Sequence, residues 1–429
     1  MAGSEWRAAA ALVLATLCLA PPALAQDDWG DDDTLPVEIH GFAEAAGSGR
    51  VVADPTATNE LVMTEARFRL DIAHYAARAE LTFKGDFVAD DITGVVTTDI
   101  RAALFKARMT GWLDLRAGRQ VLTWGTGDLL FLNDLFPKDW VSFFIGRDDE
   151  FLKAPSNSLA LAAYSKPINV DFVWTPVFTS DRYVTGERLS YFDPMVGGIV
   201  SAETMGQPLD AVPPAQTVEN GEYAARLWRT IGGWELALYG YYGFTKQPRA
   251  FDPDSARATF APLAVGGASV RANLAGGIAN VEGAYYYSRD DKNGDDPFLP
   301  NSQARGLAGY EHEIVARVNL GLQYYFEWIQ DHGALITGSP SPAYEPNEWR
   351  HLITGRLTWR LARDTWTLSL FGFVAPEDGD TYWRPVVGHQ WSDAVNLTLG
   401  ANVMTGDEDT FFGQFQNNSN LYLRLRYSF

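Results

Sequence analysis

Arginine residues at alternate positions near both ends of the sequence are the first candidates for chemistry. Arg67 and Arg69 form one such pair, and Arg424 and Arg426 form another. Residues two apart in a β-strand point to the same side, and guanidinium groups bind carboxylates and phosphates through paired hydrogen bonds. If the first and last strands meet, these side chains and Arg78 form one basic stripe. The stripe predicts a path for anionic solutes.

Many more charged side chains fall on the same face of their predicted strands, with an excess of basic ones. Such a wall keeps a channel hydrated and biases its ion selectivity. Alternatively, the charges form cross-strand pairs that stiffen the wall, and the sequence leaves both interpretations open. Asp71, Glu80 and Asp86 are placed to neutralise part of the stripe. The residues that we predict to line the lumen are Arg67, Arg69, Arg78, Lys84, Arg108, Arg116, Arg119, Asp128, Arg226, Arg317, Arg356, Arg360, Arg424 and Arg426.

The elements that must position these residues are β-strands. Residues 421–429 alternate apolar with polar side chains, and similar segments recur along the chain in pairs joined by tight links. Long links such as 124–157 and 177–221 alternate with the tight ones. This pattern is typical of an all-β, transmembrane, antiparallel up-and-down β-barrel with short periplasmic turns and long extracellular loops. We count about eighteen strands, with sixteen as the alternative, because strand 37–46 and hairpin 312–330 are weakly patterned.

Outward-facing aromatic residues gather at the two ends of the predicted strands. Trp and Tyr prefer the interface between water and lipid, because their rings are apolar but carry one polar atom. A soluble β-sandwich does not predict this segregation. The group beside the short turns and the carboxy terminus is Trp234, Trp359, Trp366 and Tyr427, and the opposite group is Phe87, Trp174, Tyr242, Phe244, Tyr285, Tyr287 and Trp328.

The composition and the amino-terminal residues indicate which partners are excluded and where the protein is located. The 429 residues carry a net charge of −20, which argues against nucleic acid as a partner. Residues 1–25 read as a signal peptide with an Ala-Leu-Ala cleavage site, and 26–36 as an acidic periplasmic lead before a barrel over 37–429. The single cysteine, Cys18, lies inside the signal peptide, so no disulfide is expected after cleavage. We expect the protein in the outer membrane of a Gram-negative bacterium.

The end of the chain also carries a candidate assembly signal. Leu425, Tyr427 and Phe429 put apolar side chains at alternate positions up to a terminal aromatic residue. This arrangement resembles the signal that the outer-membrane barrel-assembly machinery reads. The expected partners are therefore that machinery, together with outer-membrane lipid and lipopolysaccharide.

Two motifs in residues 113–182 are more specific than the repeated hairpins. The first is Gly118-Arg119-Gln120 followed by Trp124-Gly125 and Asp128, and the second is a Trp-x-Pro-x-Phe-x-x-Asp-Arg stretch at residues 174–182. This segment resembles porin-like outer-membrane proteins of Gram-negative bacteria, in particular a family of uncharacterised function, and more distantly alginate-export barrels. The resemblance implies an outer-membrane channel but assigns no substrate.

The first motif leads into a long link that we expect to fold into the barrel. Arg119 has the parity of an outward residue, and a bulge at Gly118 would turn it inward. Arg119 and Asp128 are then candidate partners in a constriction formed by residues 124–157. The alternative is a lid outside the barrel, packed on 177–221.

Metal binding and catalysis have weak support. Asp291, Asn293 and Asp295 alternate oxygen ligands as calcium loops do, but the glycine comes too early and the bidentate glutamate is missing, so an acidic turn is favoured. The six histidines show no metal-binding spacing, and no Gly-x-Ser-x-Gly motif is present. We therefore predict no cofactor and no enzymatic activity.

Three functions fit the predicted barrel. The first is a porin-like channel for diffusion of small solutes, with anionic solutes indicated by the basic stripe. The second is a barrel for export or for lipid and hydrophobic compounds, which works with periplasmic transport partners. The third is a structural or surface-binding barrel with a filled lumen.

Overall fold

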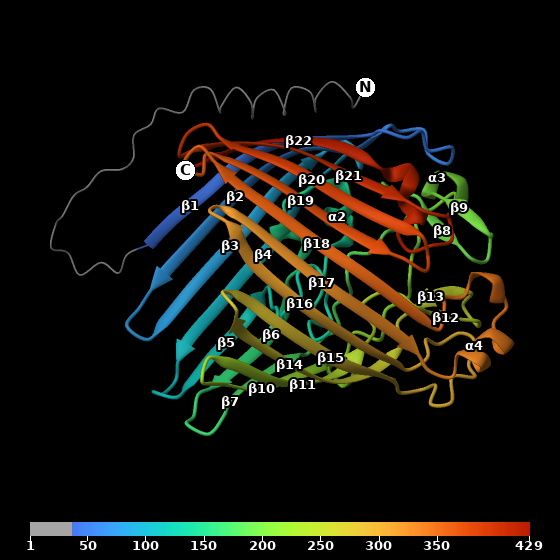
Figure 1. Cartoon of the computed structure of the whole chain (residues 1–429), viewed down its shortest axis with the longest axis horizontal. Helices are drawn as coiled ribbons and strands as arrows, with labels where there is room; N and C mark the ends of the chain where they lie inside the picture. Colours follow the sequence, from blue (N-terminus) through green and yellow to red (C-terminus); the bar gives the residue numbers. More distant parts are fainter. Residues whose placement is uncertain (1–36) are drawn as a thin grey trace.

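The computed structural model describes residues 37–429, so the predicted signal peptide and acidic lead lie outside the described residues. The chain forms a closed antiparallel β-barrel of 18 strands (Figure 1). The strands are β1 (Val37–Arg50), β2 (Leu61–Tyr75), β3 (Ala79–Asp90), β4 (Val95–Arg108), β5 (Leu113–Gln120), β6 (Ser156–Ala163), β7 (Asn169–Thr175), β10 (Glu222–Ile231), β11 (Trp234–Phe244), β14 (Pro262–Leu274), β15 (Gly277–Ser288), β16 (Gln303–Val315), β17 (Val318–Ile329), β18 (Trp349–Leu361), β19 (Trp366–Ala375), β20 (Asp380–Gln390), β21 (Val395–Thr405) and β22 (Asn420–Ser428).

The barrel closes where the last strand pairs with the first. β22 pairs with both β21 and β1, and Ala45 of β1 lies opposite Leu425. Phe429 extends the pairing through two backbone hydrogen bonds of 3.0 Å with Gly41. Closure satisfies the backbone groups that an open sheet edge would expose, so the barrel has no free edge.

The count of eighteen strands is confirmed, but several strands are longer than the sequence pattern predicts. β16 begins at Gln303, before residue 312, where the sequence pattern places the start of the hairpin 312–330. β1 continues to Arg50 although glycine and alanine give its outer face little apolar character. The ladder hydrogen bonds of both neighbours hold such weakly patterned residues in the sheet.

Short turns join the strands at one end of the barrel, called here the turn end, and the carboxy terminus lies there (Figure 1). The long connections extend from the other end, called the loop end, and contain α2 (Trp140–Ile145), η1 (Asp149–Leu152), β8 (Tyr191–Asp193), β9 (Gly198–Val200), α3 (Ala202–Met205), η2 (Val218–Asn220), β12 (Ala250–Asp252), β13 (Arg257–Thr259), α4 (His332–Gly338), η3 (Pro342–Tyr344) and η4 (Gly413–Asn418). At the same end, β3 and β4 are joined by the short connection 91–94, because both strands extend far toward the loop end. Among residues 37–429, the helices are all too short or too polar to span a membrane.

The main apolar core lies inside the barrel. Phe143 and Phe144 of α2 pack against Phe373, Tyr382 and other inward side chains of the wall. α2 is accordingly seen within the ring of strands in Figure 1. Outside the barrel, large apolar side chains of the same strands are exposed, as the alternating pattern predicts. The core therefore fixes the connection 121–155 inside the lumen.

Closure of the barrel depends on the absence of a side chain at Gly41. A Cβ atom there would lie 2.6 Å from Cζ of Phe429 and would also collide with the backbone oxygen of Arg69. We expect Gly41→Ala to destabilise the barrel by about 1–3 kcal/mol through this overpacking. The midpoint temperature for loss of the fast-migrating folded band on SDS gels should fall.

Gly47→Ala is the matched control, because Gly47 lies on the same face of β1 and its nearest neighbour, the backbone oxygen of Met63, is 4.0 Å away. The control should melt like the wild type. Equal midpoints for the two variants would contradict this account of the seam.

Candidate functional site

The candidate site is formed by the connection between β5 and β6, residues 121–155, which is here called the inward loop. The Asp139 carboxylate accepts the N–H of Ser142 at 2.8 Å and caps α2, and Gly146, with a φ of 91°, ends the helix. Asp148 then caps η1 through the N–H of Glu150. These two caps present Asp148, Asp149 and Glu150 in succession; we call them the acidic triplet.

Each member of the acidic triplet forms an ion pair with an arginine from a different strand. Asp148 is 2.9 Å from Nη1 of Arg424 on β22. Asp149 is 2.7 Å from Nη2 of Arg384 on β20, and Glu150 is 2.8 Å from Nη1 of Arg69 on β2. Five arginines whose side chains lie on this side of the lumen are here called the arginine row: Arg67, Arg69, Arg384, Arg424 and Arg426.

The carboxylates of the triplet are open to water, whereas the guanidinium groups behind them are enclosed. The Asp149 side chain is 48% exposed, but that of Arg384 is only 5% exposed. Burial favours the neutral form of Asp148, but Arg424 and Arg426 outweigh it and hold the pKa of Asp148 below its usual value. Asp148 therefore stays ionised at neutral pH, and the triplet faces the aqueous lumen.

A fully buried carboxylate and an aromatic ring hold the arginines of β2 in place. Asp86 accepts hydrogen bonds from Arg67 at 2.8 Å and from Arg69 at 2.5 Å. The Phe151 ring lies 4.1 Å from the guanidinium carbon of Arg67 and 5.0 Å from that of Arg101, so cation–π contacts add to the ion pairs. Arg101 also donates to the backbone carbonyls of Glu150 and Lys153. Arg101 thus holds the backbone at Glu150 and Lys153 against the barrel wall.

The second sequence motif supports the inward loop from the side. Asp181 accepts the N–H of Lys138 at 2.8 Å and the indole N–H of Trp140 at 2.7 Å. Burial raises the pKa of Asp181, although these groups and nearby lysines oppose the shift. Arg182 bridges Asp99 and the helix cap Asp139. The second motif therefore contacts the part of the inward loop that follows the first motif.

The other end of the inward loop is attached to the opposite wall. The Glu282 carboxylate, on β15 and 2% exposed, accepts the N–H groups of Thr126 and Gly127 and the amide of Asn133. Asp128 pairs with Arg356 of β18 through two hydrogen bonds. The loop thus crosses the lumen from β15 and β18 to β20, β22 and β2.

The predicted basic stripe is only partly reproduced. Four of its members do come together, with β1 between their strands: Arg67, Arg69, Arg424 and Arg426. Glu44 of β1 pairs with Arg426 at 2.8 Å. Arg78 does not join them, because it lies in the turn between β2 and β3. Of the acids expected to neutralise the stripe, only Asp86 does so, whereas Asp71 pairs with Lys84 and Glu80 with Lys106.

The predicted partnership of Arg119 with Asp128 is wrong. Pairing between β4 and β5 runs without a shift through Gly118, and Nε of Arg119 donates to the backbone oxygen of Ile100. The irregularity lies one strand away, between Lys84 and Gly85 of β3, where β4 contains the extra residue Arg101. Asp128 pairs with Arg356 instead.

The remaining predicted lumen residues lie away from the acidic triplet. Arg108 pairs loosely with Asp114 at 3.8 Å near the turn end, and Arg226 pairs with Glu235 and Asp171. Arg317 lies in the turn between β16 and β17. Arg116 lies opposite Lys106 and Ala160, and Arg360 lies opposite Thr367 near the turn end of β18.

Arg384 and Arg101 are site residues that our sequence prediction missed. The alternation of outward Trp383 with inward Tyr382 and Arg384 is readable in the sequence. Arg101 is turned inward by the irregularity in β4, which no sequence pattern marks. Strand parity alone could therefore have found the first residue but not the second.

The weak calcium candidate is not assembled. Within residues 37–429, no group of three or more His, Cys, Asp or Glu side chains is arranged to hold a metal ion. Asp291 is buried and accepts the N–H of Asp295 at 3.1 Å, while the carboxylate stays inside its own turn.

Comparison with solved structures identifies barrels of the same architecture. OccAB4 of Acinetobacter baumannii matches with a TM-score of 0.54 and 9% identity over 93% of this chain and 100% of its own. OccK2 of Pseudomonas aeruginosa gives a TM-score of 0.53 and 12% identity, with 92% and 97% covered. OccAB1 of Acinetobacter baumannii gives 0.52 and 12%, with 94% and 98% covered.

The likeness is one of fold. The chain has the closed 18-stranded architecture of outer-membrane porins. No protein-family model matches the chain, and no curated protein does. The finer resemblance of the Gly118-Arg119-Gln120 motif to an uncharacterised family and to alginate-export barrels stays a prediction.

Glu282 is the anchor whose loss should loosen the inward loop. Replacing it by glutamine removes the charge that holds two backbone N–H groups and the Asn133 amide, at a cost of about 1.5–3 kcal/mol. We expect Glu282→Gln to raise current noise and mean single-channel conductance in planar bilayers.

Glu311→Gln is the matched control, because Glu311 is an exposed inward acid on neighbouring β16 and, among residues 37–429, forms no hydrogen bond or ion pair with the inward loop through its side chain. It should conduct like the wild type. If the current noise and the single-channel conductance of Glu282→Gln both equal those of the wild type, Glu282 does not control the position of the inward loop.

Proposed function

We propose that the protein is an outer-membrane channel that passes small anionic solutes, and carboxylates in particular. The observation that carries the proposal is the contact between the acidic triplet and the arginine row across the lumen. A row of guanidinium groups is suited to carboxylates, which it binds through paired, charge-assisted hydrogen bonds. The protein's own carboxylates already occupy this row, so a solute of the same chemistry can exchange with them.

The accessibility of the triplet supports this exchange. Its side chains are between 36% and 48% exposed, so solutes in the lumen reach the same contacts. Arg426 is within 3.6 to 3.8 Å of Glu150 and Asp148 and has a buried nitrogen without a hydrogen-bond partner. This donor becomes available to a carboxylate that displaces the triplet.

The solved structures of similar fold are consistent with this class of solute. One OccK2 structure was obtained in complex with glucuronate, a sugar acid. With the loop end facing outside, as in outer-membrane porins, a solute meets the inward loop before the turn end. Outward-facing Leu425 and Phe429, with Tyr427, are the residues that we propose for recognition by the assembly machinery, and lipid and lipopolysaccharide surround the wall.

Removal of one arginine tests the proposal. Arg384→Gln deletes a charge of the row while keeping much of the side-chain volume, so the attraction for anions in the lumen weakens. We expect liposomes that contain the variant to swell at least about threefold more slowly in glucuronate than wild-type liposomes. Swelling in uncharged glucose should change much less.

Arg108→Gln serves as the control, because the Arg108 side chain is 72% exposed near the turn end and lies away from the triplet. Its swelling rates should match the wild type. If Arg384→Gln slows glucose and glucuronate equally, the arginine row does not select for charge.

A further inference from the structure

The outward face of the barrel wall carries almost no charge. Among residues 37–429, the outward positions of the 18 strands hold no aspartate or glutamate and only two arginines, Arg119 of β5 and Arg229 of β10. Arg229 lies beside the turn that follows β10, where its Nη1 donates to the backbone oxygen of Pro167 at 2.9 Å. Arg119 is thus the one outward arginine of the described strands that lies near the loop end.

The strand register fixes the direction of the Arg119 side chain. Arg119 lies opposite Ala103 of β4 on one side and opposite Asn157 of β6 on the other. Ala103 and Asn157 are both exposed on the outside of the wall. Arg119 and Asn157 therefore lie side by side on the membrane-facing surface, outside the lumen.

This pair lies where the apolar surface of its two strands ends. The outward positions between the pair and the turn end are all apolar: Leu113, Leu115, Ala117, Leu159, Leu161 and Ala163. Leu159 lies opposite Trp174, an outward aromatic residue of the loop-end group, and Asn157 is two residues nearer the loop end. The apolar band of an outer-membrane barrel ends at aromatic residues and lipid head groups. Arg119 and Asn157 are therefore at head-group level.

The guanidinium group of Arg119 is oriented but not neutralised. Its Nε donates to the backbone oxygen of Ile100. Nη1 and Nη2 form no hydrogen bond or ion pair with any residue between 37 and 429, and neither atom is sealed from its surroundings. The nearest charged groups are Asp99 and Arg182, but Asp99 already accepts two hydrogen bonds of 2.8 Å from Arg182. Two adjacent N–H donors thus remain for an external anion.

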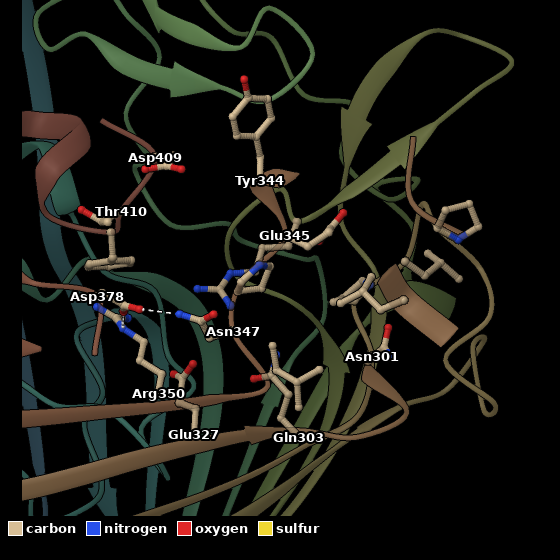
Figure 2. Close-up of a pocket in the computed structure, with 18 of the residues that line it drawn as sticks. Asn301, Gln303, Glu327, Tyr344, Glu345, Asn347, Arg350, Asp378, Asp409 and Thr410 are labelled. Atoms are coloured by element: carbon tan, nitrogen blue, oxygen red, sulfur yellow. Dashed lines mark hydrogen bonds and ion pairs between the residues drawn. The ribbon is translucent and has the colours of Figure 1, made fainter. Parts of the chain in front are cut away.

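Inside the barrel, by contrast, an arginine can be neutralised by a carboxylate of the protein. In the cavity at the loop end, Figure 2 shows Arg350 beside Asp378 and Asn347, and Nε of Arg350 is 3.2 Å from the Asp378 carboxylate. The membrane face offers Arg119 no such partner. A second copy packed wall to wall could not supply one either, because the outward positions of strands within 37–429 hold no carboxylate. The remaining source of an anion is the membrane.

From this arrangement we propose that Arg119 and Asn157 form a binding site for a phosphate group of lipopolysaccharide. A guanidinium group binds phosphate through two parallel N–H bonds, and the Asn157 amide adds a donor. An ionised arginine that faces lipid is costly, and a phosphate partner at head-group level offsets that cost. The acyl chains then lie along the apolar outward residues of β5 and β6. The site is outside the lumen, so the inference does not depend on the proposed channel function.

Binding of lipid A, the phosphorylated lipid anchor of lipopolysaccharide, to the purified full-length barrel in detergent tests the site. Native mass spectrometry gives the dissociation constants. Arg119→Gln should weaken binding by about tenfold, because the paired contact with phosphate is lost. Arg229→Gln is the matched control, since Arg229 is the other outward arginine but lies at the turn end. It should bind lipid A like the wild type.

Two further lipids test the chemistry on the wild type itself, so the result does not depend on the folding of a variant. Dephosphorylated lipid A should bind at least about tenfold more weakly than lipid A, because it lacks the anion. Phosphatidylglycerol should also bind about tenfold more weakly, because its phosphate is a diester with a single charge, whereas the phosphate monoesters of lipid A carry more.

Four results would overturn the site: equal affinity of Arg119→Gln and the wild type, equal weakening in Arg229→Gln, or equal affinity of the wild type for dephosphorylated lipid A or for phosphatidylglycerol. A dimer that forms without lipid and is lost in Arg119→Gln would assign this face to a second copy of the chain and would also overturn it.

Discussion

The ion pairs between the acidic triplet and the arginine row determine how the inward loop is placed within the lumen. A barrel of 18 strands is wide enough to enclose water, and here the inward loop crosses that space. Its apolar residues pack on one part of the wall, but the position of its tip is set by Arg69, Arg384 and Arg424. Among residues 37–429, Arg384 and Arg424 form ion pairs only with the triplet, so without these contacts both would be left without a carboxylate partner.

The energetics of this arrangement explain how one set of contacts serves both structure and transport. Breaking a buried ion pair by removing one partner is costly, because the other charge is left desolvated. Exchange of one carboxylate for another avoids that cost, since the guanidinium keeps a partner throughout. Asp86 holds Arg67 and Arg69 in place regardless of what lies in front of them. The row therefore persists as a binding surface while its partner changes.

The alternation of side chains between the two faces of a strand, here called strand parity, made most of the fold and part of the site predictable. The alternation of Leu423, Arg424 and Leu425 identifies the face that each side chain occupies, and this extends to Arg67 and Arg69. The bulge that we expected to turn Arg119 inward is absent, because the irregularity lies at Arg101 in the neighbouring strand. Strand parity could not reveal the acidic triplet as the partner of the row, since ion pairs between residues more than 200 positions apart depend on how a loop folds.

The reversal potential of the wild-type channel across a tenfold KCl gradient tests the central claim most directly. The arginine row and its exchangeable carboxylates predict that chloride carries most of the current, so the potential takes the sign of an anion-selective pore. Raising the salt concentration on both sides should reduce this selectivity as the charges are screened. A potential of the opposite sign, showing that potassium carries most of the current, would contradict the account.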